Sequence, residues 1–134
     1  MIVVDTNILA YLYIQGERSC QVESLLAADS NWCAPVLWRS EFRSVLGLYL
    51  RKALLSLEEV LLIIDQAEKL LIDNEYELPP ANIMRLVNES NCSAYDCEFV
   101  ALAQFLRVPL VTEDRKILME FPGVAVSVAQ FLGN

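Results

Sequence analysis

The chain has 134 residues, 55% hydrophobic and 21% charged, and its 18 acidic and 10 basic residues give a net charge of −8. This length and composition predict one globular domain over residues 1–134 with a core of its own. Histidine is absent. This excludes histidine-based acid–base catalysis, Ser-His-Asp and Cys-His nucleophiles and histidine-ligated zinc, and it favours chemistry carried by carboxylates.

The four cysteines, Cys20, Cys33, Cys92 and Cys97, form no Cys-x-x-Cys pair. We interpret them as reduced thiols of a cytoplasmic protein. No run reaches the roughly 18 consecutive apolar residues of a membrane span. Asp5 interrupts the apolar N-terminal run, so no signal peptide is expected either.

Short apolar, β-branched runs predict strands, and apolar residues that recur every three or four positions predict helices between them. The expected strands are Ile2–Val4, Trp32–Ala34, Tyr76–Leu78, Pro109–Thr112 and Val124–Val126. The expected helices are Ile8–Ile14, Cys20–Ala28, Leu37–Lys52, Leu57–Ile72, Ala81–Glu89, Ser93–Leu106, Asp114–Met119 and a final turn at Val128–Leu132. Ser19 and Ser56 are the expected caps of the second and fourth helices, Ser56 in a capping box with Glu59. The alternation predicts an α/β fold with a parallel sheet and helices on both faces.

Two acids follow predicted strands directly. Asp5 comes after Ile2–Val4, and Asp114 comes shortly after Pro109–Thr112. In parallel sheets, ligands bind beyond the carboxyl ends of the strands, so both acids suit a binding site there. Both also suit a helix N-cap, and the sequence leaves the two roles open.

Two more acids lie on helix faces that are otherwise apolar. Glu41 shares a face with Val45 and Leu48, and Asp96 shares one with Phe99 and Val100. Each has an alternative role. Glu41 suits a surface ion pair with Arg39 or Arg43, and Asp96 suits a capping box that begins at Ser93.

The four acids become informative when taken together. If Asp5, Glu41, Asp96 and Asp114 converge on one crevice, they repel one another unless cations lie between them. Carboxylates are the ligands that Mg²⁺ and Mn²⁺ prefer. A bound divalent ion also inverts the local charge, so the net negative charge is compatible with a metal-dependent nuclease.

Four segments carry a family resemblance. These segments are Val3-Val4-Asp5-Thr6-Asn7, Glu41 with Val45-Leu46, Asp96 to Ala103, and Leu110 to Lys116. They resemble the motifs of the PIN-domain ribonucleases, in particular the VapC-type toxins of toxin–antitoxin modules. The resemblance runs over essentially the whole chain. It implies a three-layer α/β/α fold with a central parallel sheet of four to five strands. It also implies a Mg²⁺- or Mn²⁺-dependent endoribonuclease with an antitoxin partner.

The resemblance assigns the acidic quartet to Asp5, Glu41, Asp96 and Asp114, with Thr6, Asn7 and Thr112 as polar support. We expect Asp5 and Asp96 to be the principal metal ligands, Asp114 to bind metal directly or through water, and Glu41 to orient the nucleophilic water or complete the metal shell. Ser44 departs from the asparagine of many relatives, and Cys97-Glu98 is an unusual pair beside the third acid. Glu113 adjoins Asp114 and is expected to point away from the site.

Basic residues and one apolar helix predict the partners. Arg39, Arg43, Arg115 and Lys116 are the basic residues nearest the acids in sequence and are candidates for phosphate contacts with RNA. The segment Leu57–Ile72 is apolar on more than one face, which predicts a homodimer or a partner groove.

Two alternatives to the nuclease stay open. One is a non-catalytic PIN-like interaction module, since fold does not imply function. The other is a haloacid-dehalogenase-like phosphatase, which would use Asp5 but wants a second aspartate where this chain has Asn7.

Overall fold

A five-stranded parallel sheet forms the centre of the protein, in a computed structural model that describes residues 1–133. The strands are β1 (Ile2–Val4), β2 (Trp32–Pro35), β3 (Glu75–Tyr76), β4 (Leu110–Val111) and β5 (Ala125–Val126). Their order is β3-β2-β1-β4-β5, and every neighbouring pair is parallel. The prediction of an α/β fold with a parallel sheet of four to five strands is confirmed.

β1 lies in the middle of this sheet. Val3 is in register with Cys33 of β2 on one side and Leu110 of β4 on the other. Every residue of β1 and β2 is buried, as expected for strands with helices on both faces. The acids that follow β1 and β4 are therefore brought to one edge of the sheet.

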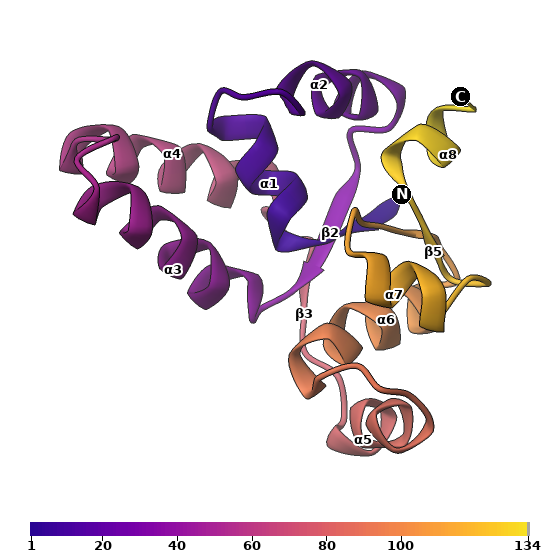
Figure 1. Ribbon diagram of the computed structural model, residues 1–134. Helices are drawn as coiled ribbons and strands as arrows, with labels where there is room; N and C mark the ends of the chain where they lie inside the picture. The colour runs from indigo at the N-terminus through magenta and orange to yellow at the C-terminus, as the bar shows by residue number, and fades with distance from the viewer. Residues whose placement is uncertain (134) are drawn as a thin grey trace.

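Within the described residues, eight helices cover the sheet (Figure 1). They are α1 (Thr6–Tyr13), α2 (Ser19–Ala28), α3 (Trp38–Arg51), α4 (Leu57–Leu70), α5 (Pro80–Glu89), α6 (Ala94–Leu106), α7 (Arg115–Glu120) and α8 (Val128–Leu132). Figure 1 shows α1 to α4 gathered on one side of the sheet and α5 to α7 on the other, while α8 returns to pack against α2. The three-layer arrangement is thus α/β/α, with α6 packed along β1 and β2.

Local sequence explains most helix ends. The Ser56 hydroxyl accepts a hydrogen bond from the Glu59 amide, and the Glu59 carboxylate accepts one from the Ser56 amide, so the predicted capping box is confirmed. Ser19 does not cap α2, whose N-cap is Arg18. Ser19 is buried, and its hydroxyl donates to the Tyr11 and Ile14 carbonyls instead.

The third strand differs from its predicted position. It covers Glu75–Tyr76 rather than Tyr76–Leu78, because its partner β2 ends at Pro35, which pairs with Tyr76. The Val36 amide donates the last hydrogen bond to the Tyr76 carbonyl, and the chain then turns into α3. Pairing therefore stops at Tyr76.

One continuous core fills both sides of the sheet, with Trp32, Trp38, Phe42 and Phe99 among its largest fully buried side chains. The four cysteines are free thiols, three of them buried. Among the helices described, none has the length and apolar composition needed to cross a membrane.

Candidate functional site

Asp5 occupies the N-cap position of α1, yet its side chain makes no capping hydrogen bond. The carboxylate instead accepts a hydrogen bond from the Thr112 hydroxyl, 2.7 Å from Oγ1 to Oδ2. Thr112 is fully buried, and its Oγ1 also accepts the Asp114 amide at 3.0 Å. The capping interpretation of Asp5 is therefore wrong, and Thr112 has the supporting position that the sequence predicted for it.

Glu41 lies in the first turn of α3 and accepts a hydrogen bond from the Thr6 hydroxyl, 2.7 Å from Oγ1 to Oε1. The ion-pair alternative is wrong. Among residues 1–133, Arg43 forms no ion pair, and the Arg39 guanidinium pairs with Glu75 and Glu68. We therefore expect Arg39 to stabilise the fold rather than to contact phosphate.

Asp96 and Asp114 both lie near the start of a helix, but they differ in their roles in capping it. The Ser93 hydroxyl accepts the Asp96 amide as the cap of α6, which is one half of the predicted capping box. Asp114 is the N-cap of α7, and its Oδ1 accepts the Ile117 amide at 3.0 Å. The capping interpretation of Asp114 is therefore confirmed, although the same residue also faces the pocket described next.

The four acids line one open pocket of about 280 Å³. Thr6 and Asn7 line it as well, and the remaining lining residues are Ser44, Val45 and Leu48. These last three were not among the predicted site residues. They follow Glu41 by three, four and seven positions on α3, and the helical spacing that places Val45 and Leu48 on the face of Glu41 is the signal that indicates them.

The acids perturb one another electrostatically. The pKa of Asp5 is raised to about 6, mainly by burial; the Thr112 hydrogen bond opposes the rise, and the charge of Glu41 contributes to it. Burial also raises the pKa of Glu41, with added repulsion from Asp96 and Glu98. The pKa of Asp96 is raised by burial and by the charge of Asp114. Perturbed carboxylates that share a pocket are a mark of functional sites.

Positive charge near the quartet is sparse. Within residues 1–133, none of the four acids forms an ion pair. Lys116 acts only at a distance, where its charge lowers the pKa of Asp96. The repulsion among the acids is thus left for a bound cation or protons to relieve.

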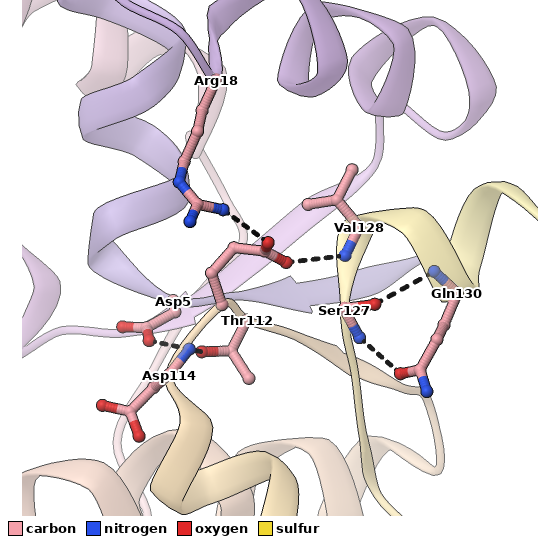
Figure 2. Close-up of polar contacts among 8 residues, drawn as sticks. Asp5, Arg18, Thr112, Asp114, Ser127, Val128 and Gln130 are labelled. Atoms are coloured by element: carbon pink, nitrogen blue, oxygen red, sulfur yellow. Dashed lines mark hydrogen bonds and ion pairs between the residues drawn. The ribbon is translucent and has the colours of Figure 1, made fainter. Parts of the chain in front are cut away.

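Glu113 is not among the residues that line the pocket, in agreement with the prediction that it points away. One of its carboxylate oxygens accepts a hydrogen bond from Arg18 at 2.6 Å, and the other accepts the Val128 amide at 3.0 Å; the dashed lines from Arg18 and Val128 in Figure 2 mark these contacts. Glu113 therefore joins the start of α2 and the start of α8 to the segment that carries Thr112 and Asp114. It is not a fifth acid of the site.

The donor set suits a hard divalent cation, since it consists of carboxylate and amide or hydroxyl oxygens. Within the described residues, however, no group of three or more acids or thiols is already arranged to hold a metal ion. Three of the acids already accept a hydrogen bond within the protein: Asp5 from Thr112, Glu41 from Thr6, and Asp114 from the Ile117 amide. A cation would use the remaining oxygens, bridging waters or rotated side chains.

The protein has a parallel sheet of order β3-β2-β1-β4-β5, and four acids from separate segments lie at its carboxyl edge. This combination defines a class of α/β domains with an acidic pocket. The family model of the PIN domain matches residues 2–121. The chain therefore belongs to the PIN-domain family. This decides against the phosphatase-like alternative.

Several known proteins are similar over nearly their whole length. Ribonuclease VapC3 from Pyrobaculum aerophilum is 27% identical over 126 residues, which cover 92% of this chain and 96% of that protein. The crystal structure of PAE2754 from the same organism matches with a TM-score of 0.69 at 20% identity, covering 98% of this chain and 93% of that one.

Two further solved structures share the fold. FitAcB from Neisseria gonorrhoeae gives a TM-score of 0.73 at 16% identity, and a toxin–antitoxin complex from Klebsiella pneumoniae gives 0.62 at 20%. Each alignment covers 96% of this chain and 98% of the other.

Proposed function

We propose that this protein is a Mg²⁺- or Mn²⁺-dependent endoribonuclease and the toxin of a toxin–antitoxin pair. One observation carries the proposal: Asp5, Glu41, Asp96 and Asp114 come from four separate segments and line one pocket without an ion pair among the described residues. Membership of the PIN-domain family and likeness to Ribonuclease VapC3 support the same reading.

The roles of the residues follow from their surroundings. Asp5 and Asp96 are assigned as the principal ligands, because both are partly buried acids at the carboxyl edge of the sheet. Asp114 completes the shell directly or through water. Glu41 is held by Thr6 and orients the attacking water. Bound Mg²⁺ or Mn²⁺ supplies Lewis-acid stabilisation of the charge that develops on the phosphate and leaving oxygens.

An antitoxin and a second copy of the chain are the proposed protein partners. The Klebsiella structure is by its title a toxin–antitoxin complex of the same fold, which supports the first. The second rests on α4, where Leu57, Leu61 and Leu62 are each more than half exposed. Large apolar side chains that stay exposed in a folded domain mark interaction surfaces.

Thermal melting tests the metal site without knowledge of the RNA target. We expect Mg²⁺ or Mn²⁺ to raise the midpoint of the wild type relative to EDTA, because a ligand that binds only the folded state stabilises it. Asp96→Asn should lose this response. Asp73→Asn is the matched control, since Asp73 is exposed and lies outside the pocket and should respond as the wild type does.

Cleavage of a mixed RNA substrate with the same proteins tests the reaction. Asp5→Asn and Asp96→Asn should abolish metal-dependent cleavage, whereas Asp73→Asn should retain it. Near wild-type rates in either pocket variant would overturn the assignment.

A non-catalytic interaction module is the second candidate. The observation that favours it is the engagement of Asp5, Glu41 and Asp114 in hydrogen bonds within the protein. If neither Mg²⁺ nor Mn²⁺ changes the melting midpoint of the wild type, this candidate is supported and the nuclease is contradicted.

A further inference from the structure

A second pocket, of about 340 Å³, adjoins the acidic one. Asn7 and Val45 line both pockets, so the two are continuous along α1 and α3. The second pocket differs in chemistry, because its lining includes Tyr11, Gln15, Arg18 and Tyr49, with Glu17 as its single acid and none of the four acids of the first pocket. Its volume falls within the range of about 300–1,000 Å³ that is usual for ligand pockets.

The loop that borders this pocket is fixed by a buried serine. Ser19 is 1% exposed. Its hydroxyl accepts the Gly16 amide at 3.0 Å and lies 2.8 Å from the Tyr11 carbonyl and 3.2 Å from the Ile14 carbonyl, to which it donates. These contacts hold residues 14–18 against the end of α1. The pocket is therefore preformed rather than an accident of a loose loop.

Arg18 connects the second pocket to the acidic one. Its guanidinium lies 5.4 Å from the centroid of the Tyr11 ring and pairs with Glu113 at 2.6 Å (Figure 2). Glu113 directly precedes Asp114. A ligand that contacts Arg18 therefore contacts the ion-pair partner of Glu113, and Glu113 is the sequence neighbour of Asp114, which lines the acidic pocket.

We propose that this second pocket binds a nucleobase of the RNA next to the phosphate that is cleaved. Tyr49 forms no stacking or cation–π pair among the described residues, and it is partly exposed in the pocket lining. A partly exposed aromatic ring is a platform on which bases stack. The side-chain amides of Asn7 and Gln15 present the donors and acceptors that read a base edge. This assignment rests on the proposed ribonuclease function.

A basic peptide is the other occupant to consider, because Glu17 also lines the pocket and Arg18 is already paired with Glu113. The flat polar edge of a base is favoured because it matches the two amides and the guanidinium of the lining. A base in this pocket would also place its own phosphate toward Asn7 and Val45, which the acidic pocket shares. We therefore expect the pocket to determine which nucleotide flanks the cut.

Nucleotide binding in EDTA tests the pocket separately from cleavage. The ¹⁵N-labelled protein is titrated with AMP, GMP, CMP and UMP, and amide shifts are recorded by NMR. We expect at least one nucleotide to shift the amides of Gly16, Arg18 and Tyr49 saturably. Tyr49→Ala should weaken its affinity about fivefold or more, the lower limit for the loss of one stacked base, and Tyr49→Phe should retain it.

Phe105→Ala is the matched control, because Phe105 is a 62% exposed aromatic residue of α6 outside both pockets. It should bind nucleotide as the wild type does. In cleavage assays, Tyr49→Ala and Gln15→Ala should change the nucleotide preference at the cut, and Phe105→Ala should not.

The outcomes separate the two proposals. The base pocket is overturned if no nucleotide shifts these amides, or if an octa-arginine peptide shifts them and the nucleotides do not. In that case, metal-dependent cleavage that needs Asp5 would still support the proposed ribonuclease. If a nucleotide binds as expected but the wild type cleaves no RNA, the ribonuclease is overturned and the pocket stands as a nucleotide site.

Discussion

The Thr112 hydroxyl donates to the Asp5 carboxylate at 2.7 Å across 107 residues of sequence, and it accepts the Asp114 amide at 3.0 Å. One buried threonine thereby fixes two acids, one beyond β1 and one beyond β4 (Figure 2). Because both strands are anchored in the sheet, the separation of the two acids is set by strand register rather than by a loop.

Thr112→Val should raise the pKa of Asp5 above its value of about 6. The hydrogen bond from Thr112 stabilises the charged carboxylate, and the valine keeps the shape while it removes the donor. Titration of the Asp5 carboxyl carbon by ¹³C NMR measures the change. Thr112→Ser keeps the hydroxyl and should titrate as the wild type does. The same titration curve for Thr112→Val and the wild type would contradict the prediction.

Asp5→Asn should stabilise the metal-free protein at neutral pH. The pKa of Asp5 rises from 3.8 to about 6 on folding, so between these values the folded state binds more protons than the unfolded state, and stability falls as the pH rises. This sets an upper limit of about 3 kcal/mol on the gain. Urea unfolding in EDTA should show the variant as the more stable protein at pH 7.5 and the difference closing toward pH 4. Equal free energies of unfolding for the variant and the wild type at pH 7.5 would contradict the prediction that a charged Asp5 destabilises the fold.

Arg39→Ala should destabilise the fold without weakening RNA binding. The guanidinium joins α3 to Glu75 of β3 and Glu68 of α4, and the Trp38 indole donates to the same Glu75 carboxylate at 2.7 Å. Since the Arg39 side chain is 35% exposed, we expect a cost of only about 1 kcal/mol in the free energy of unfolding. Arg43→Ala is the control, because Arg43 forms no ion pair among residues 1–133. A weaker RNA complex with unchanged stability would restore Arg39 as a phosphate contact.

Leu61→Glu should convert a dimer into a monomer. Leu61 is 57% exposed on α4, four residues from Leu57, which is 60% exposed. Light scattering should give twice the chain mass of 15.1 kDa for the wild type and a single chain mass for the variant. Met119→Glu, on the opposite side of the sheet at α7 and 76% exposed, should remain a dimer. A monomeric wild type would refute the prediction.

Most of the fold follows from local patterns in the sequence. The strand cores at Ile2–Val4 and Trp32–Pro35 and the cap at Ser56 were predictable because apolar runs and capping residues act over a few positions. Ser19 was misassigned because its partners, the Tyr11 and Ile14 carbonyls, become available only when α1 ends where it does. β3 was misplaced because its length depends on where β2 stops.

The acidic pocket was predictable and the neighbouring one was not. Two of the acids follow predicted strands and two lie on otherwise apolar helix faces, and the resemblance to the PIN-domain ribonucleases grouped the four into one site. Tyr11, Arg18 and Tyr49 carry no such clue, because they come from α1, the following loop and the end of α3. Only the packing of α3 beside α1 brings Tyr49 to the pocket that Tyr11 and Arg18 line.

The central position of β1 has a consequence for synthesis. Ribosomes deliver Ile2–Val4 early, but its neighbour β4 follows only at Leu110–Val111, and pairing over such separations waits for both partners. The last of the four acids, Asp114, is synthesised 109 residues after Asp5 (114 − 5). A nascent chain that stops short of Asp114 thus carries no assembled acidic pocket, and the site is complete only after β4 and the start of α7 have left the ribosome.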